Sequence, residues 1–580
     1  MFHAAMMCSR LGRCGALLLS GALGCGAQLS RVGSPVQTAA GPPRIDRLTD
    51  LGSLPLPTQG PLPERQADGL LTPGEWVAVR GQNLAGSLDA RLAGRPLRIG
   101  GYLADGGVLL QVPRGLPVGQ QVLSIDNGQG RAETPVQTAS YVIAADAEGS
   151  HVAFRRLQLE TDDKGPRLGL ADAASLSHSR ARFLALSPDG GILYALSEAT
   201  AAGPAAAAAN PRDPAARSAS ASSVSQASLL VVQMGAKQGP AAVASLPLVL
   251  PGEPTAIRMS PQGILAIATA RAVTLLATAE TPLSPRILQT LGLVSEPEPR
   301  ALTAGAFLNG GRTLALLEAY GNDVYFVDLA TPTAPQPRGM LNLSGAVGEP
   351  YSIDLAETPD GASLWVLQGP NFRLAGKRLR DGLKGAWGAA TTLQWKRAGR
   401  ALGGVVAPDR GASHARLLRL VVGPQGADLA DEIALPPALL PLSMTATADA
   451  VHISVLHGEN PFQNVEASLT GIERLFSALR STVQVGQVLR VDAHSGQSQV
   501  QTQGLAMYGE LATLPGGGLL IGTLRLGPGY LPPRLTLDFG FEIGGGPFSK
   551  HREVANTALG LGDAVQRLVP PYRIDRIAAQ

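Results

Sequence analysis

The sequence contains little cysteine, little charge and few aromatic residues. Its three cysteines all lie within the first 25 of 580 positions, so no disulfide framework can hold the remaining chain together. Charged residues make up 16% and aromatic residues 4%, and no Lys/Arg patch is interleaved with aromatics. Nucleic-acid binding therefore lacks its electrostatic footprint. After the N-terminal region no run of about 20 apolar residues occurs, as a transmembrane helix would need.

Glycine, proline and apolar residues are abundant instead. The chain has 70 Gly, 45 Pro and 45% hydrophobic residues, enough to bury a sizeable core. Gly and Pro together form about a fifth of the chain, which is below the range of low-complexity disordered sequence. Short apolar runs separated by frequent turn residues predict an all-β protein.

The first 24 residues have the form of a signal peptide. Arg10 and Arg13 precede a short apolar segment at residues 15–23, which is too short to cross a bilayer as a helix. We assign residues 1–24 to a leader that is removed. Loss of its two arginines lowers the formal charge from +3 to about +1.

The leader ends in LSGALGC at residues 19–25, which resembles the lipobox of bacterial lipoproteins. The resemblance implies that Cys25 is lipidated, with palmitate among its acyl chains, and that it attaches the protein to the membrane. The match departs from the family pattern at Ala22, where Leu is preferred. Gly26 replaces the Asp that commonly retains lipoproteins at the inner membrane, which implies the outer membrane. The alternative is an ordinary secretory signal with an incidental cysteine.

Two segments precede the main body of the chain. Residues 25–63 are rich in Gly, Pro, Ser, Thr and Gln, and we expect them to form a flexible tether. Residues 64–147 contain short strand patterns at sandwich-like spacing. Their order resembles the IPT/TIG immunoglobulin-like domain, with PG at 73–74, AGRP at 93–96 and VPRGLPVG at 112–119. The resemblance implies a binding or spacer module without catalytic residues. Trp76 is expected to face its core, the alternative being a surface anchor.

A tight turn between apolar strands recurs through the rest of the chain. Its clearest copy is SPDG at residues 187–190, where Pro presets φ, Asp bonds its own backbone and Gly tolerates positive φ. Looser copies lie at residues 260–263, 308–311, 358–361, 407–410, 447–449 and 514–517. Several intervals are about 40–50 residues, the length of a four-stranded propeller blade. Residues 148–580 are therefore predicted to form a β-propeller of about seven blades.

The SPDG..LY.L pattern resembles the YVTN/lactonase-like propellers, which implies an architecture and not an activity. We expect strands at residues 264–268, 273–277, 313–317, 324–328, 363–367, 417–422, 452–456, 485–491 and 519–524. Two insertions interrupt the repeat. Residues 199–228 form a low-complexity Ala/Ser-rich loop, and residues 459–480 carry apolar side chains at helical spacing. The predicted fold is thus an Ig-like β-sandwich and a propeller with one inserted helix.

No catalytic or metal site is predicted. His452, His457 and Glu459, together with Asp492 and His494, match no zinc motif, and histidines five apart on a strand point to opposite faces. The charged loop at residues 161–165 lacks the spacing of an EF-hand. Asp189 and Asp360 are interpreted as turn formers. The RIDR sequence occurs at both 44–47 and 573–576, where a shared role at a sheet edge and coincidence both remain open.

These observations favour a non-enzymatic binding or scaffold protein of the bacterial cell envelope. Its partners are expected to be the membrane, through Cys25, and an envelope protein or glycan. No cofactor is expected. The alternatives are a lactonase-like hydrolase, a quinoprotein-like dehydrogenase, or a component of a secretion, motility or polysaccharide-export complex. Convergent carboxylates and histidines at the mouth of the propeller funnel would favour an enzyme, whereas an apolar or neutral funnel would oppose it.

Overall fold

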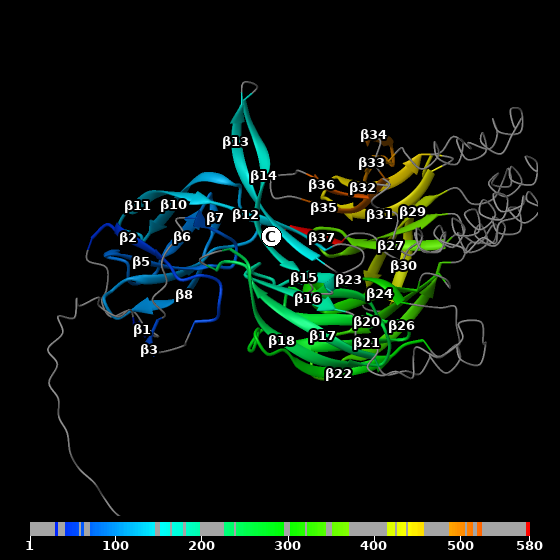
Figure 1. Cartoon of the computed structure of the whole chain (residues 1–580), viewed down its shortest axis with the longest axis horizontal. Coiled ribbons are helices and arrows are strands. Elements are labelled where there is room, and N and C mark those ends of the chain that lie inside the picture. Colours follow the sequence, from blue (N-terminus) through cyan, green and yellow to red (C-terminus); the bar gives the residue numbers. More distant parts are fainter. Residues whose placement is uncertain are drawn as a thin grey trace, which may run out of the picture.

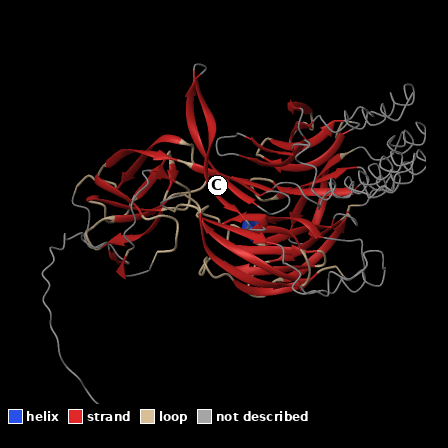
Figure 2. Cartoon of the chain, in the orientation of Figure 1, coloured by secondary structure: helices blue, strands red, loops and turns tan. Residues whose placement is uncertain are grey.

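The computed structural model describes most of the chain as strands joined by short turns. The described residues are 30–32, 41–56, 60–62, 70–145, 151–162, 165–177, 181–197, 225–236, 239–294, 302–318, 322–343, 351–369, 415–423, 426–436, 439–457, 486–504, 507–513, 519–524 and 576–579. Figure 2 shows them as almost entirely strand. Within them, no helix has the length and apolar character needed to cross a membrane.

The N-terminal module consists of two sheets (Figure 1, blue). In sheet order, the first contains β2 (Arg44–Asp50), β5 (Trp76–Gln82), β9 (Val108–Gln111), β8 (Arg98–Leu103), β1 (Ser30–Val32) and β3 (Gly60–Pro61). The second contains β4 (Leu70–Leu71), β11 (Arg131–Thr138), β10 (Gly119–Asp126), β6 (Asp89–Leu92) and β7 (Arg95–Pro96). Both sheets contribute to one buried apolar cluster, so the module is a β-sandwich.

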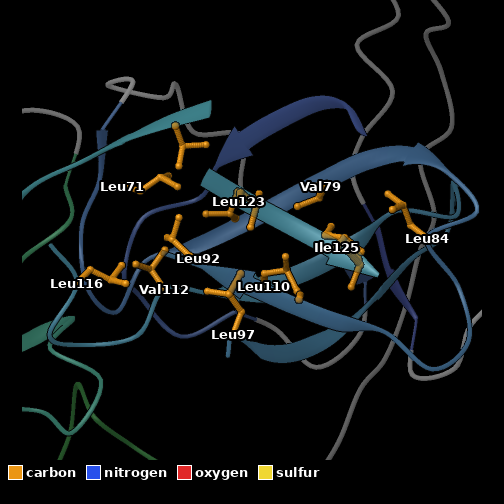
Figure 3. Close-up of a cluster of buried hydrophobic side chains, with 14 residues drawn as sticks. Leu71, Val79, Leu84, Leu92, Leu97, Leu110, Val112, Leu116, Leu123 and Ile125 are labelled. Atoms are coloured by element: carbon orange, nitrogen blue, oxygen red, sulfur yellow. The ribbon is translucent and has the colours of Figure 1, made fainter. Parts of the chain in front are cut away.

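Strand alternation explains the sandwich core. On β5, Val77 and Val79 face the inter-sheet cluster, where they meet Leu110 of β9 and Leu123 and Ile125 of β10 (Figure 3). The intervening Ala78 belongs to a second apolar cluster on the opposite side of the sheet. Period-2 patterning therefore assigns each side chain to a layer, as the sequence indicated.

The expected tether is wrong over much of its length. Residues 44–50 form β2, which pairs antiparallel with β5, and Leu51, Leu56 and Leu62 join the cluster that covers the outer side of the sheet. This segment has apolar residues to bury despite its Pro- and Gly-rich composition. Trp76 also packs in this outer layer, with its ring over Gly100, where a Cβ would lie 2.1 Å from the ring. Trp76 thus packs within the module, although not between its two sheets.

Seven further sheets form the second module, and we number them as blades 1 to 7. Blade 1 contains β12 (Ser140–Ala145), β13 (His151–Asp162), β14 (Gly165–Ser177) and β37 (Arg576–Ala579). Blades 2 and 3 contain β15 (Ala181–Leu186), β16 (Ile192–Ser197), β17 (Ser225–Gln233), β18 (Ala241–Leu250), β19 (Pro254–Met259), β20 (Ile264–Thr269), β21 (Ala272–Ala277) and β22 (Arg286–Gly292).

The remaining blades follow the same antiparallel order. Blades 4 and 5 contain β23 (Leu302–Leu308), β24 (Thr313–Glu318), β25 (Asp323–Asp328), β26 (Gln336–Asn342), β27 (Tyr351–Glu357), β28 (Ser363–Gly369), β29 (Arg416–Gly423) and β30 (Gly426–Ala434), with a 3₁₀ turn η1 (Asn309–Gly311) after β23. Blade 6 contains β31 (Leu439–Ala446), β32 (Ala450–His457), β33 (Gly486–Asp492) and β34 (Ser498–Gly504), and blade 7 contains β35 (Met507–Thr513) and β36 (Leu519–Leu524).

The first strand of each blade packs beside the first strand of the next, which closes a ring. Strands β15, β19, β23, β27, β31 and β35 are neighbours in that order, and β37 packs beside both β35 and β15. Because β37 pairs antiparallel with β12, the C-terminal strand completes the blade that begins directly after the sandwich (Figure 1). The module is therefore a seven-bladed β-propeller, as predicted, and its closure leaves few exposed sheet edges.

Two domain boundaries differ from expectation. Strand β12 covers residues 140–145, which we expected in the sandwich, but it pairs with β13 and β37 of blade 1. Residues 225–228 fall in β17 and not in the expected low-complexity insertion. The expected helix at 459–480 lies outside the described residues. The two RIDR segments belong to different modules, since residues 44–47 lie in β2 and Arg576 begins β37.

The recurring turn connects the first two strands of a blade. In the first copy, Ser187 Oγ donates to Asp189 Oδ1, which also accepts from the Gly191 backbone N–H. Thr358 and Asp360 repeat the hydroxyl–carboxylate bond in blade 5, and Thr447 and Asp449 repeat it in blade 6. Asp189 and Asp360 are thus turn formers, as interpreted from the sequence.

The blade count agreed with prediction because two errors cancelled. The expected turn at 407–410 lies outside the described residues, between β28 and β29 of blade 5, so it does not begin a blade. Blade 1 has no such turn, since its first strand arrives from the other end of the chain. Counting turns thus added one blade and missed another.

The sandwich and the propeller are joined by direct contacts at the blade 2 turn. Gln111 Nε2 of the sandwich donates to Asp189 Oδ2 at 2.8 Å, and the Gly235 N–H of the propeller donates to Ser53 Oγ at 3.1 Å. Burial lowers the pKa of Arg114, and the negative charge of Asp189 partly offsets this effect. The turn that defines the repeat is therefore also the attachment point for the other module.

Three glycines let the two backbones approach closely at this junction. A Cβ on Gly74 would lie 2.2 Å from the Gly191 backbone nitrogen, and one on Gly191 would lie 2.9 Å from Ser53 Cβ. A Cβ on Gly235 would lie 2.2 Å from the carboxylate of Glu75, which is itself buried and accepts from the Thr72 N–H. Side chains at these positions would force the modules apart, so the junction requires glycine.

Candidate functional site

The strands that surround the propeller axis are mainly apolar, with a few charged exceptions. These inner strands carry six charged residues, which are Arg182 on β15, Arg258 on β19, Asp354 and Glu357 on β27, Glu510 on β35 and Arg576 on β37. The structure describes the side chains of Arg258, Asp354, Glu357 and Glu510. They belong to blades 3, 5 and 7, yet Arg258 interacts electrostatically with Asp354 and Glu357, and Asp354 interacts with Glu510. Side chains from alternate blades interact electrostatically because they converge on the axis.

Arg258 connects blade 3 to blade 4. Its Nε donates to the Gly305 carbonyl of β23 at 2.8 Å, and its Nη1 donates to the Ile257 carbonyl at 2.9 Å. A Cβ on Gly305 would lie 3.6 Å from Arg258 Cγ, an ordinary contact distance, and 3.1 Å from Leu316 Cδ2, which is tight. The guanidinium is therefore fixed by backbone carbonyls and does not swing freely.

Glu357 and Asp354 connect blade 5 to its two neighbours. They are an odd number of residues apart on β27, so they leave opposite faces of the strand. Glu357 Oε2 accepts from the Phe307 N–H of β23 at 3.1 Å. Asp354 Oδ2 accepts from the Met444 N–H at 3.0 Å and from Ser443 Oγ at 3.1 Å, both on β31. Each carboxylate thus satisfies a backbone group on the free edge of an inner strand.

Both carboxyl groups are less acidic than usual. Burial raises the pKa of Asp354, against the lowering effects of its hydrogen bond from Met444 and of Arg258. Burial likewise raises the pKa of Glu357, against its bond from Phe307 and the charge of Arg258. Glu357 is nevertheless exposed to solvent and Asp354 partly so. Carboxyl groups with raised pKa values and specific charged neighbours are typical of functional sites.

Arg258 and Glu357 each retain unused hydrogen-bonding capacity. Within the described part of the chain, Nη2 of Arg258 and Oε1 of Glu357 have no protein partner, and neither side chain is in an ion pair within 4 Å. Arg258 on β19 and Glu357 on β27 therefore place a fixed cationic donor and a fixed carboxylate acceptor on the two sides of β23. No group of three or more His, Cys, Asp or Glu side chains suited to a metal ion occurs among the described residues.

The histidines considered from the sequence lie away from this axis. His452 is buried on β32, the second strand of blade 6, and its Nδ1 lies 2.7 Å from Gln501 Oε1. His494 lies in the exposed turn after β33, where its N–H donates to Asp492 Oδ1. His457 ends β32, and Glu459 lies outside the described residues. The side chains of His452 and Asp492 are thus bonded to nearby residues of blade 6.

The charged loop singled out from the sequence lies on another part of blade 1. Residues 161, 162 and 165 lie at the far end of the long β13–β14 hairpin, which projects beyond the rest of blade 1 (Figure 1). Cys25 lies outside the described residues. Arg258, Asp354 and Glu357 were not predicted from the sequence. Their available signal was a charge inside an otherwise apolar strand, in PTAIRM and YSIDLAE.

Comparisons with known proteins return the fold alone. No protein-family model matches the chain, and no curated protein matches it. A Bacteroides fragilis protein provisionally named 6-phosphogluconolactonase has 10% identity and a TM-score of 0.41, covering 67% of this chain and 88% of its own. The periplasmic gluconolactonase of Pseudomonas aeruginosa has 11% identity and a TM-score of 0.33, covering 66% of this chain and 99% of its own.

A β-propeller domain from Myceliophteria thermophila is equally similar. It has 10% identity and a TM-score of 0.34, covering 66% of this chain and 93% of its own. These values are too low to carry an argument about activity. The propeller assignment rests on the seven sheets and their closure described above.

Proposed function

We propose that this protein is an envelope lipoprotein that binds a partner through its propeller, while a lipid on Cys25 attaches it to the membrane and the sandwich acts as a spacer. The observation that carries the proposal is the junction between modules. Gln111, Asp189, Ser53 and Gly235 connect them directly, and glycines allow backbone contact. A spacer that is fixed to its propeller can hold a binding face at a defined position, which a flexible linker cannot do.

The proposed lipid on Cys25 would keep the sandwich near the bilayer. Only four residues lie between Cys25 and the first described strand, so the chain advances five positions to reach Ser30. Five extended residues span at most roughly 18 Å. A sandwich with an IPT/TIG-like role as a spacer would then rest close to the membrane surface, and the propeller would lie beyond it.

The anchor is tested by membrane fractionation of cells that produce the Cys25→Ser variant. We expect the variant in the soluble fraction and the unmodified protein in the membrane fraction, since one lipidated residue supplies the attachment. A variant that remains with the membrane would overturn the anchor. Separating inner from outer membranes in the same experiment tests the expected outer-membrane location.

The partner role is tested by chemical cross-linking in intact cells, followed by purification of the full chain. We expect a specific envelope component to be captured, and we expect Gly235→Ala, which disturbs the junction, to reduce its yield. Capture that is unaffected by a loosened junction would contradict the role assigned to the rigid spacer.

A second candidate function is hydrolysis of a lactone at the propeller axis. The observation that favours it is the charged axis, since Asp354 and Glu357 have raised pKa values and are solvent-accessible. A protonated carboxyl group can act as a general acid, and an ionised one can activate water. We would measure hydrolysis of glucono-δ-lactone above the uncatalysed rate. Activity that falls at least about 100-fold in Glu357→Gln would favour this function, and no activity in the unmodified protein would exclude it for this substrate.

A further inference from the structure

We propose that Arg258 and Glu357 form a binding site for a neutral polyhydroxylated ligand, such as a monosaccharide unit of a glycan. This deepens the proposed function, because it names a site and a ligand class for the propeller. It does not depend on Cys25 or on membrane attachment.

The two side chains present complementary groups that a sugar can use together. Glu357 Oε1 accepts hydrogen bonds only, when ionised, and Arg258 Nη2 donates only. A hydroxyl group both donates and accepts, so neighbouring hydroxyls on one ring can bond the carboxylate and the guanidinium simultaneously. Such charge-assisted bonds are roughly twice as strong as neutral ones.

The arrangement is fixed before any ligand arrives. Gly305 holds Arg258 by its Nε, and Phe307, two residues further along the same strand, holds Glu357 by its Oε2. Both free groups are therefore positioned by β23, the inner strand between them. A site that is ordered in advance loses little conformational entropy when it binds.

The local charge favours a neutral ligand over an anion. Arg258 interacts electrostatically with Asp354 and Glu357, and Asp354 interacts with Glu510, so carboxyl groups outnumber the guanidinium within this linked set of side chains. A ligand carboxylate or phosphate would meet this excess of acidic groups. Sugar hydroxyls carry no charge and avoid the repulsion.

An extended peptide fits this location less well. Peptides commonly bind sheet edges by pairing with free backbone groups. Here the Phe307 and Met444 N–H groups and the Gly305 carbonyl are already bonded to side chains of neighbouring blades. Those edge positions are not available for an added strand.

The test is ligand-observed NMR with the purified full chain, using D-glucose as the probe and D-gluconate as its anionic counterpart. We expect a millimolar Kd for D-glucose and binding of D-gluconate at least about fivefold weaker. Glu357→Gln keeps an oxygen that can accept from the Phe307 N–H but loses the negative charge. Arg258→Lys keeps the positive charge but loses the planar set of N–H donors of the guanidinium. Each should weaken D-glucose binding roughly fivefold or more, the effect of losing one charge-assisted bond.

Glu133→Gln is the matched control, because it removes an exposed carboxylate of the sandwich and should leave binding unchanged. Absence of D-glucose binding by the unmodified protein overturns the proposal. Unchanged binding by either axial variant also overturns it, as does tighter binding of D-gluconate than of D-glucose.

A second measurement does not depend on the folding of a variant. Phenylglyoxal modifies accessible arginines, and mass spectrometry can follow its reaction at Arg258. D-glucose should slow modification of Arg258 but not of the sandwich residue Arg91, which is half exposed. Equal protection or no protection at the two arginines contradicts the proposal. Neither result affects membrane release by Cys25→Ser or capture of a protein partner, so the wider proposed function stands or fails separately.

Discussion

The sandwich and the propeller are both all-β, yet they bury their strands in different ways. The sandwich closes within residues 30–138, and its two sheets share one core that includes Val79, Leu110 and Ile125. The propeller closes only when β37, at the far end of the chain, pairs with β12 of blade 1. All strands of the sandwich therefore lie within about a hundred residues of one another in the chain. Every propeller blade, by contrast, depends on a ring that is completed by four residues near the C-terminus.

The two modules also differ in where their charged residues lie and in what they bond. In the sandwich, charges such as Arg91 and Asp89 lie on the surface in exposed ion pairs, which contribute little to stability. At the propeller axis, Arg258, Asp354 and Glu357 bond the backbone of neighbouring blades. The axial charges are thus part of how adjacent blades meet, and their remaining atoms are available for a ligand.

Truncation after Tyr572 should have the largest effect, because it removes β37. Blade 1 would lose its innermost strand, and β15 and β35 would lose a neighbour. We expect the propeller to lose at least about 5 kcal/mol, enough to unfold a typical domain, while the sandwich remains folded. Limited proteolysis with mass spectrometry should yield a resistant fragment from the sandwich alone. Survival of the propeller would show that ring closure contributes little.

Gly235→Ala should have a smaller effect, confined to the junction. Its Cβ would meet the carboxylate of Glu75, and accommodating it should cost roughly 1–3 kcal/mol. Calorimetry should then show the sandwich and propeller unfolding as more separate transitions. Gly292→Ala is the control, because nothing lies within 4 Å of an added Cβ there. If both variants unfold alike, the two modules are not coupled through this contact.

Substitution of the two matched turn aspartates should distinguish a turn at the junction from one at the surface. Asp189 accepts hydrogen bonds from Ser187, Gly191 and Gln111. Asp360 accepts hydrogen bonds from Thr358 and Ala362, which belong to its own exposed turn. Asp189→Ala should cost about 1–3 kcal/mol, and Asp360→Ala less than about 1 kcal/mol. Chemical denaturation measures both, and equal losses would mean that the bond to Gln111 adds nothing.

The smallest expected effect is a dependence of propeller stability on pH. Burial raises the pKa of Asp354 and Glu357 above their ordinary values of 3.8 and 4.5, so the folded protein holds their protons over a pH range where the unfolded chain has lost them. Stability should therefore fall as pH rises through that range. The double variant Asp354→Asn, Glu357→Gln should flatten the profile. A steeper fall in the variant would reverse the assigned direction of the shifts.

Much of the fold could be predicted because short stretches of sequence determine the strands of each blade. Strands expected at residues 264–268, 273–277 and 363–367 appear within one or two residues as β20, β21 and β28. Each is an apolar run bounded by turn residues, and each is covered on both faces. The hydroxyl and carboxylate of the recurring turn also act within three residues, so their pattern is visible without a structure.

The same locality explains the errors. Composition marked residues 44–62 as a tether, yet Leu51 and Leu62 are buried because a distant sheet face is available to cover. The site at the axis was missed because Arg258 and Glu357 lie about a hundred positions apart and meet only through β23. No spacing rule relates them, since the relation depends on the order of blades around the ring.

The sequence by itself determined the strands, the turns and the all-β class, because backbone preference and apolar alternation act over a few residues. Only the tertiary structure decided that β37 closes the ring, that Asp189 joins two modules and that four charges from three blades converge. These features depend on contacts between residues far apart in the chain. They exist because burying apolar strands on both faces forces the blades into a closed circle.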